Sequence, residues 1–203
     1  MPFMGNNYQY IDPDYKYTGK SGILRNLANI EDGKVLLAYE SLKVSKRVEE
    51  LFENPIKLKD ADSLLTIHHY LFQDVYEWAG KIRTVNISKS GKPFFNGERF
   101  NTAFQYVDNL IAEYRKIKKS DKQQLSNKLA KILDSVNFLH PFREGNGRTQ
   151  REFLRTLALE KDLILNLNPP DNQDVYDRYM LGTINGDIEQ LSKLIFELIA
   201  QPD

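Results

Sequence analysis

The 203-residue sequence predicts an all-α fold, a helical bundle that carries one short β-hairpin. Apolar residues recur every three or four positions over most of the chain, which is the spacing of helices that bury one face. Alternation with a period of two, which is typical of strands, is confined to one stretch near the middle. The length favours a single domain, and a hydrophobic content of 41% is sufficient for a buried core.

Residues 1–34 are expected to form an N-terminal arm, and residues 35–203 the main domain. The arm begins as a polar segment, and its tyrosines are expected to pack on the surface: Tyr8, Tyr10, Tyr15 and Tyr17. The first helix should run from Val35 to the break at Asn54-Pro55, and the second over about residues 60–73. Five more helices are expected around the apolar stripes at residues 104–117, 125–136, 153–158, 175–179 and 191–198.

Residues 81–95 are expected to form the hairpin. Arg83, Val85 and Ile87 fall on one face of an extended chain, because successive side chains of a strand point to opposite faces. Residues 88–91, Ser-Lys-Ser-Gly, have the composition of a turn, and an extended run resumes at Pro93. A lone two-stranded hairpin is only marginally stable, so this one must lie on another part of the protein.

Composition excludes several classes of function. Lys plus Arg and Asp plus Glu both number 28, so the formal net charge is zero and no global field favours nucleic acid or an anionic membrane. Because there is no cysteine, disulfides, thiolate metal sites and a cysteine nucleophile are excluded. No secretory signal is expected, and the apolar stretches are too short to span a bilayer. We therefore expect neither a nucleic-acid nor a membrane partner.

Residues 140–151 read His-Pro-Phe-Arg-Glu-Gly-Asn-Gly-Arg-Thr-Gln-Arg and predict a turn between two helices. Pro141 disfavours continued helix at His140, whereas Gly145 and Gly147 permit positive φ and a close backbone approach. Successive N–H groups in such a turn form an anion-binding nest, and the next helix adds its positive end. That helix should begin near residues 146–148, where a phosphate would sit.

The side chains of this run suit nucleotide chemistry. Arg148 and Arg151 lie three residues apart on one helix face, and each guanidinium group can bind two phosphate oxygens at once. Glu144 is a single carboxylate beside the nest, which is how Mg²⁺ is usually held together with phosphates. His140 titrates near neutral pH and can take a proton from an attacking hydroxyl. Each feature alone is more often structural, but their coincidence within twelve residues favours a functional anion site.

The run resembles the signature of the Fic-domain family, His-Pro-Phe-x-(Asp/Glu)-Gly-Asn-Gly-Arg-x-x-Arg, and every specified position is met. Residues 77–83, followed by the hairpin, resemble the stretch that leads into the Fic flap. Residues 17–30 resemble the N-terminal arm of many bacterial members. The resemblance covers about residues 15–165 and identifies residues 35–203 as a Fic domain, with its flap at about residues 83–95.

The resemblance implies a protein adenylyltransferase that moves AMP from ATP to a hydroxyl side chain of a target protein and releases pyrophosphate. Carried over by position, His140 is the general base and Glu144 holds Mg²⁺. The phosphates are bound by Gly145, Asn146, Gly147, Arg148 and Arg151. The flap would pair with an extended target segment, and Ile87 and Ser88 lie where it approaches the site.

Many relatives silence themselves with a helix whose Glu, in a (Ser/Thr)-x-x-x-Glu-(Gly/Asn) pattern, pairs with the first signature arginine. No such pattern occurs in this chain. The resemblance therefore implies a small antitoxin-like partner that presents a Glu to Arg148. It also implies a toxin or an effector, acting in the bacterial cytoplasm or injected into a host cell.

Two alternatives stay open at this point. The same loop can transfer another phosphate-containing moiety, such as a different nucleoside monophosphate, phosphocholine or phosphate, or the domain can be a catalytically silent binding module. A P-loop nucleotidase is poorly supported, because Gly-x-x-x-x-Gly-Lys-(Ser/Thr) is absent. His68 and His69 are neighbours on the second expected helix, where they point about 100° apart. We expect core or surface roles for them rather than a shared metal.

Overall fold

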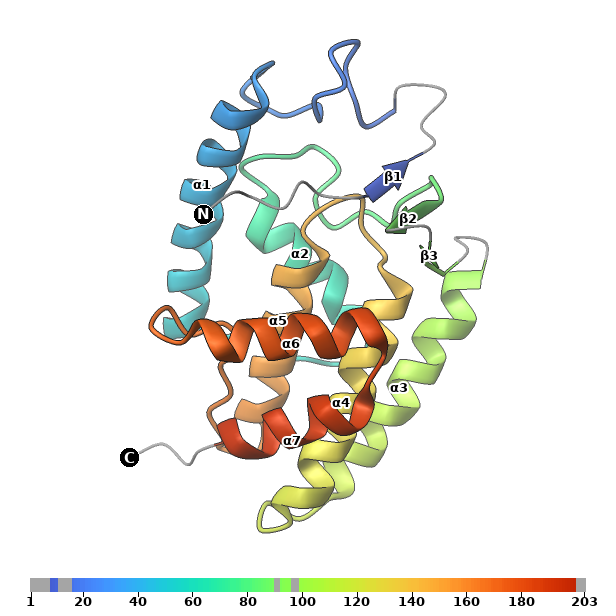
Figure 1. Ribbon diagram of the computed structural model, residues 1–203, viewed down its shortest axis with the longest axis vertical. Helices are drawn as coiled ribbons and strands as arrows, with labels where there is room; N and C mark the ends of the chain where they lie inside the picture. The colour runs from blue at the N-terminus through green and yellow to red at the C-terminus, as the bar shows by residue number, and fades with distance from the viewer. Residues whose placement is uncertain (1–7, 11–15, 90–91, 96–98, 200–203) are drawn as a thin grey trace. The chain divides into compact units, whose positions relative to one another are not determined.

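The computed structural model describes residues 8–10, 16–89, 92–95 and 99–199 of the chain (Figure 1). In these residues seven helices and three short strands follow one another, which confirms the all-α fold class. The helices are α1 Gly33–Glu53, α2 Ser63–Phe72, α3 Phe100–Lys116, α4 Lys122–Leu139, α5 Asn146–Leu159, α6 Gln173–Asn185 and α7 Ile188–Leu198. The strands are β1 Tyr8–Tyr10, β2 Ile87–Lys89 and β3 Lys92–Pro93. Within the described residues, no helix has the length and apolar character that crossing a membrane requires.

The chain folds as two compact units, each built from separate stretches of sequence. The first comprises Met1–Pro55, Leu65–Phe100 and Leu139–Asn146, and therefore holds α1, most of α2, the strands and the turn at residues 140–146. The second comprises Ile56–Leu64, Asn101–Phe138 and Gly147–Asp203. The signature is consequently shared, with its turn in the first unit and its two arginines on α5 in the second.

In the first unit, Tyr17 of the N-terminal arm is more closely packed than expected. The side chain of Tyr17 is only 5% exposed, with its ring edge against Trp78 and its hydroxyl accepting from the backbone N–H of Thr84 at 3.1 Å. The expectation of surface packing is therefore wrong for Tyr17, because the apolar body of Tyr is buried wherever its hydroxyl finds a partner. Tyr15 lies outside the described residues.

The hairpin is confirmed, but its strands are shorter than predicted. β2 pairs antiparallel with β3, and Ser88 lies opposite Pro93. Residues 81–86 do not extend β2, because the N–H groups of Arg83 and Thr84 donate to Pro141 and Tyr17 instead of to a neighbouring strand. The outer edge of β2 is not open either, since β1 of the arm pairs along it in an antiparallel register.

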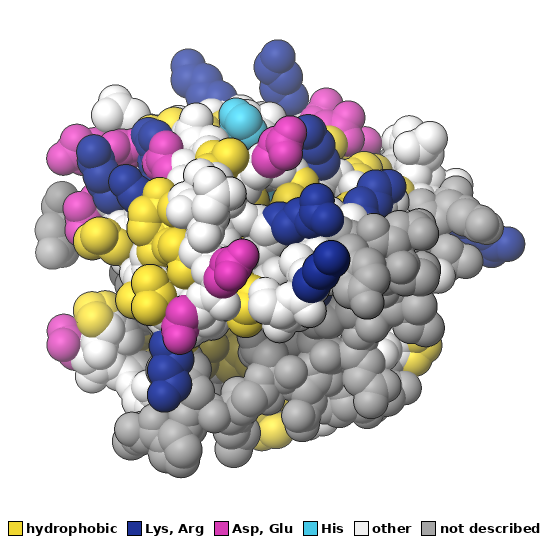
Figure 2. All heavy atoms as spheres, turned by 90° about the horizontal axis from the view of Figure 1, so that it is seen from above, with side chains coloured by type: hydrophobic (Ala, Val, Ile, Leu, Met, Phe, Trp, Pro, Cys, Tyr) yellow, Lys and Arg dark blue, Asp and Glu magenta, His cyan; other side chains and the backbone are white. Residues whose placement is uncertain are grey.

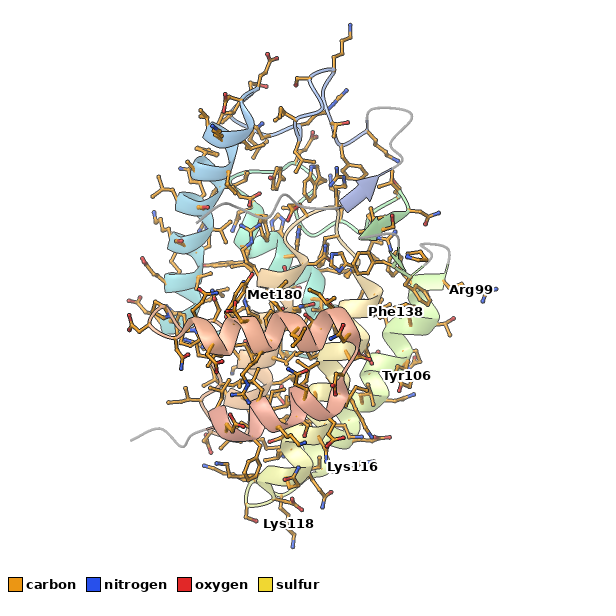
Figure 3. All side chains as sticks on the ribbon, viewed as in Figure 1. Arg99, Tyr106, Lys116, Lys118, Phe138 and Met180 are labelled. Atoms are coloured by element: carbon orange, nitrogen blue, oxygen red, sulfur yellow. The ribbon has the colours of Figure 1, made fainter. Side chains whose placement is uncertain are left out.

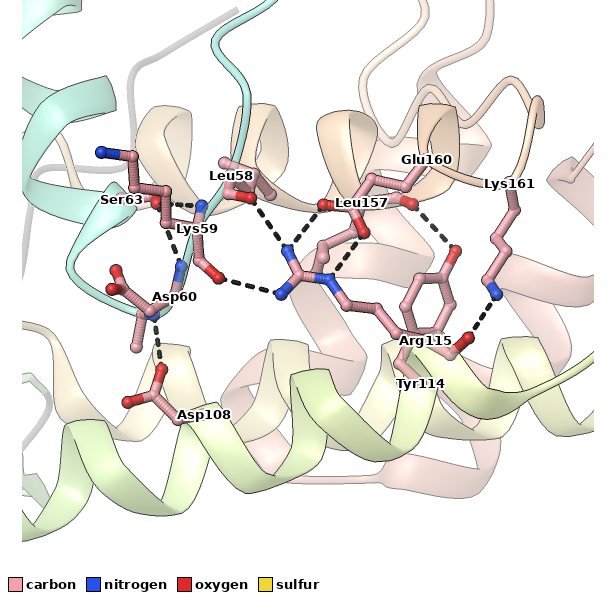
Figure 4. A network of polar contacts seen from close by, with 11 residues as sticks. Leu58, Lys59, Asp60, Ser63, Asp108, Tyr114, Arg115, Leu157, Glu160 and Lys161 are labelled. Atoms are coloured by element: carbon pink, nitrogen blue, oxygen red, sulfur yellow. Dashed lines mark hydrogen bonds and ion pairs between the residues drawn. The ribbon is translucent and has the colours of Figure 1, made fainter.

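In the second unit, the apolar residues of α5 are fully buried as predicted: Phe153, Leu154, Leu157 and Ala158. Arg115 at the end of α3 ties three segments together (Figure 4). It forms an ion pair with Glu160 at 2.8 Å and donates to the carbonyls of Leu58 and Lys59 at 2.9 Å. Near it, at the end of α3, Lys116 and Lys118 project into solvent (Figure 3).

Charged side chains on the face drawn in Figure 2 are mixed in sign. Lys and Arg lie among Asp and Glu over the described part of that face, and no large field of one sign covers it. This distribution agrees with the zero formal net charge of the sequence.

Candidate active site

The turn of the signature begins where α4 ends at Leu139 and finishes where α5 begins at Asn146, as the sequence predicts. His140 has a φ of 44°, in the left-handed region that residues other than glycine adopt only at a cost. Pro141 follows it and excludes continued helix. The strained residue is therefore the one predicted to act as the general base.

The imidazole of His140 is buried and covered by the hairpin. Its side chain is 6% exposed, and its ring stacks on Phe94 with the ring centroids 3.8 Å apart and the planes inclined by 19°. Phe94 is itself tied to β2, because its N–H donates to the carbonyl of Ile87 at 3.0 Å. Ile87 is buried and Ser88 is half-buried, and these two predicted flap residues lie on β2, which Phe94 bonds directly after the end of β3.

Glu144 is half-buried, and one carboxylate oxygen accepts from the N–H of Gly145 at 3.0 Å. Within the described parts of the chain, no group of three or more His, Asp or Glu side chains could hold a metal ion. A single, partly accessible carboxylate next to N–H groups that are predicted to bind phosphate fits Mg²⁺, which usually takes one or two protein carboxylates and completes its shell with phosphates and water.

The main chain of Glu144 is held by His68, whose role sequence reasoning did not find. The N–H of Gly80 donates to Nδ1 of His68 at 2.8 Å, so the ring is neutral and its Nε2–H donates to the carbonyl of Glu144 at 3.0 Å. The His68 side chain is fully buried, and its ring stacks on Phe142 at 3.8 Å. Its only sequence signal is an imidazole on the apolar face of a helix, which is more often just core.

Gly145 and Asn146 shape the turn. Gly145 has a φ of 82°, and a Cβ atom at this position would lie 2.3 Å from Cζ of the buried Phe72. The side chain of Asn146 accepts from the N–H of Phe142 at 2.9 Å and donates to its carbonyl at 2.8 Å. The Asn146 amide therefore holds the turn together through both its oxygen and its nitrogen, and we expect the backbone N–H groups to contact a phosphate.

Gly145→Ala is expected to destabilise the protein by about 2–5 kcal/mol, because a left-handed alanine costs about 1–2 kcal/mol and overpacking a core another 1–3 kcal/mol. Thermal or denaturant unfolding measures the change. Gly22→Ala is the matched control, since Gly22 has a φ of 77° but an added Cβ atom would meet no other atom within 4 Å. Equal losses in the two variants would show that the contact with Phe72 is unimportant.

In the second unit, α5 carries the two arginines of the signature. Arg148 is half-buried, and the guanidinium of Arg151 lies over the rings of Tyr176 and Tyr179 of α6, 5.7 Å and 5.5 Å from their centroids. A hydrogen bond from Gln150 to the Tyr179 hydroxyl fixes the second ring. Aromatic faces attract a guanidinium without neutralising it, so the charge of Arg151 stays available for an anion. Neither tyrosine was predicted to belong to the site.

Comparison with known proteins agrees with these features. Residues 58–158, which include the whole signature, match the model of the Fic/DOC family. Protein adenylyltransferase VbhT of Bartonella schoenbuchensis is 33% identical over 194 residues, which are 95% of this chain and 39% of that protein. The chain therefore spans about two fifths of the length of VbhT.

A second relative matches over its whole length. Probable protein adenylyltransferase y4lH of Sinorhizobium fredii is 31% identical over 193 residues, which are 95% of this chain and 98% of that one. Among solved structures, BepC, a VirB-translocated effector protein of Bartonella tribocorum with bound AMPPNP, superimposes with a TM-score of 0.79. It is 21% identical, and the match covers 93% of this chain and 98% of BepC. The chain belongs to the Fic/DOC family.

Proposed function

We propose that this chain is a protein adenylyltransferase, which moves AMP from ATP to a hydroxyl side chain of a target protein and releases pyrophosphate. The observation that carries the proposal is the complete signature, folded as a turn that holds a buried imidazole and leads directly into a helix with two arginines. The names of VbhT and y4lH support the same reaction.

In this mechanism His140 is the general base. Its imidazole takes the proton of the target hydroxyl as the hydroxyl oxygen forms a bond to the α-phosphorus of ATP. The bond between that phosphorus and the oxygen bridging to the β-phosphate breaks, and pyrophosphate leaves with the electron pair. The stacking of Phe94 on His140 restricts the ring to one plane, which limits the orientations in which it can accept the proton.

The remaining signature residues bind and neutralise the phosphates. The N–H groups of Gly145, Asn146 and Gly147 and the positive end of α5 stabilise negative charge. Arg148 and Arg151 compensate the charge that builds up on the leaving β- and γ-phosphates. Glu144 would hold Mg²⁺, which would offset the negative charge of the phosphates.

The target docks on the hairpin, at about residues 83–95, as an extended segment that adds to its sheet. Ile87 and Ser88 of β2 then lie beside the acceptor residue. A separate antitoxin-like protein that presents a Glu to Arg148 would inhibit the chain, because a carboxylate there competes with a phosphate for the guanidinium. The chain is then a toxin or an effector, which acts in the bacterial cytoplasm or in a host cell.

Incubation of the purified chain with bacterial lysate and either α-labelled or γ-labelled ATP tests the proposal. We expect protein label from the α-phosphate only, without any added activator. Label from the γ-phosphate only would contradict the proposal and indicate transfer of phosphate. A folded chain that labels nothing in bacterial or host-cell lysate would count against adenylyl transfer from ATP.

A further inference from the structure

Arg83, in the segment that leads into the hairpin, forms hydrogen bonds to the turn that carries His140. Its Nε donates to the carbonyl of His140 at 2.8 Å, and its backbone N–H donates to the carbonyl of Pro141 at 2.8 Å. The Arg83 side chain is only 2% exposed. One buried residue therefore holds two successive carbonyls of the turn, those of His140 and Pro141.

The same guanidinium also closes the base of the hairpin. Nη1 of Arg83 donates to the carbonyl of Val85 at 2.6 Å, and Nη2 donates to the carbonyl of Phe95. Val85 precedes β2 and Phe95 follows β3, so the two ends of the hairpin meet on one side chain. The planar guanidinium directs its donors along fixed lines from three separate nitrogen atoms, whereas the three donors of a lysine ammonium all radiate from one nitrogen atom.

Burying the charged guanidinium of Arg83 costs free energy, and packing alone does not explain why the protein accepts that cost. Burial lowers the pKa of Arg83 to about 10, so the group still carries its charge at neutral pH inside the protein. The ring of Phe100 lies 5.2 Å from the guanidinium and supports that charge. His140 meanwhile keeps a strained φ of 44°, which persists only where the surroundings fix the backbone.

We propose that Arg83 is a positioning residue for AMP transfer, which orients the His140 imidazole by holding its carbonyl and by setting the hairpin, with Phe94, against its ring. The inference rests on the proposed function. Arg83 acts through His140 and not through the nucleotide, so its loss should lower the rate of transfer and leave ATP binding unchanged.

The first test is spectroscopic and does not depend on activity. The chain has three histidines, so His140→Ala assigns the ring protons of His140 by NMR. Stacking on Phe94 gives these protons a ring-current shift, and Arg83→Gln should change it while the signals of His69 stay in place. Arg115→Gln is the matched control, because Arg115 also bonds two backbone carbonyls but belongs to the second unit (Figure 4). Unmoved His140 signals in Arg83→Gln would overturn the inference.

The second test is a double-mutant cycle on transfer of α-labelled AMP to protein in lysate. Arg83→Gln should lower transfer about 10²-fold in the parent, as expected for a misplaced catalytic group, and add no further loss in the His140→Ala background. Arg83→Lys, which keeps the charge, should recover part of the rate and remains available if Arg83→Gln does not fold. Equal losses in both backgrounds would overturn the inference. A parent that transfers no AMP would refute the proposed function, while the NMR result would still decide the role of Arg83.

Discussion

His140→Ala is expected to lower the rate of AMP transfer by about 10²–10⁴-fold, which is the usual contribution of a general base. The affinity for ATP should not change, because the groups proposed to bind the phosphates are the N–H groups and arginines that follow His140. Initial rates of protein labelling from α-labelled ATP, together with a titration of the enzyme with a fluorescent ATP analogue, measure the two quantities separately.

Two companion variants make this result specific. His69→Ala removes an exposed imidazole from the same unit and should transfer AMP at the parent rate. His140→Asn should be as inactive as the alanine variant, although asparagine tolerates the left-handed backbone that His140 adopts. Activity in the asparagine variant would show that the alanine variant fails through backbone strain, and a parallel loss of ATP binding would contradict the role of a base.

Arg151→Ala is expected to lower the rate of AMP transfer by about 10²–10³-fold, the loss seen when one preorganised group that stabilises developing charge is removed. The rings of Tyr176 and Tyr179 hold this guanidinium in place before the substrate arrives, so little reorganisation is needed when charge builds up on the leaving pyrophosphate. Arg151→Lys should recover only part of the rate, because an ammonium lacks the planar fork. The turnover number at saturating ATP measures both effects.

Arg178→Ala on α6 is the control for Arg151. Arg178 pairs with Glu197 at 2.7 Å on the surface, and an exposed pair of this kind is worth about 0–1 kcal/mol. This variant should keep the parent rate and nearly the parent stability. If Arg151→Lys were as active as the parent, the site would need only a positive charge. The proposed bidentate contact between the Arg151 guanidinium and a phosphate would then be wrong.

The helices and the signature turn could be predicted from the sequence, because they depend mainly on residues that are close together in the chain. The seven helices follow from apolar spacing, and the start of α5 at Asn146 follows from the two glycines and the proline of the signature. The role of Gly145 in the turn was equally predictable, because positive φ is a property of a single residue. What could not be seen was that Phe72 also leaves no room for a side chain there.

The parts that escaped prediction are those that depend on contacts between distant segments. His68 and Arg83 lie 76 and 57 residues before the carbonyls of Glu144 and His140 that they bond, and no local pattern announces such a pairing. The strands of the hairpin are shorter than their alternating sequence suggests, for the same reason. The N–H of Arg83, which would have extended β2, is taken by Pro141 of the turn.

The pairing of β1 along the outer edge of β2 affects how strongly a target can bind. A target segment that adds to this edge must compete with β1, which is part of the same chain as β2. Its apparent dissociation constant is the intrinsic one divided by the fraction of molecules with an open edge, so an edge open in about 1% of molecules weakens binding about 100-fold. Pro93 has no N–H to donate, which makes the opposite edge of the sheet a poorer template. If the target docks on this edge as proposed, β1 would set the target concentration at which the chain responds, and removing β1 would lower that threshold without altering a single residue of the signature.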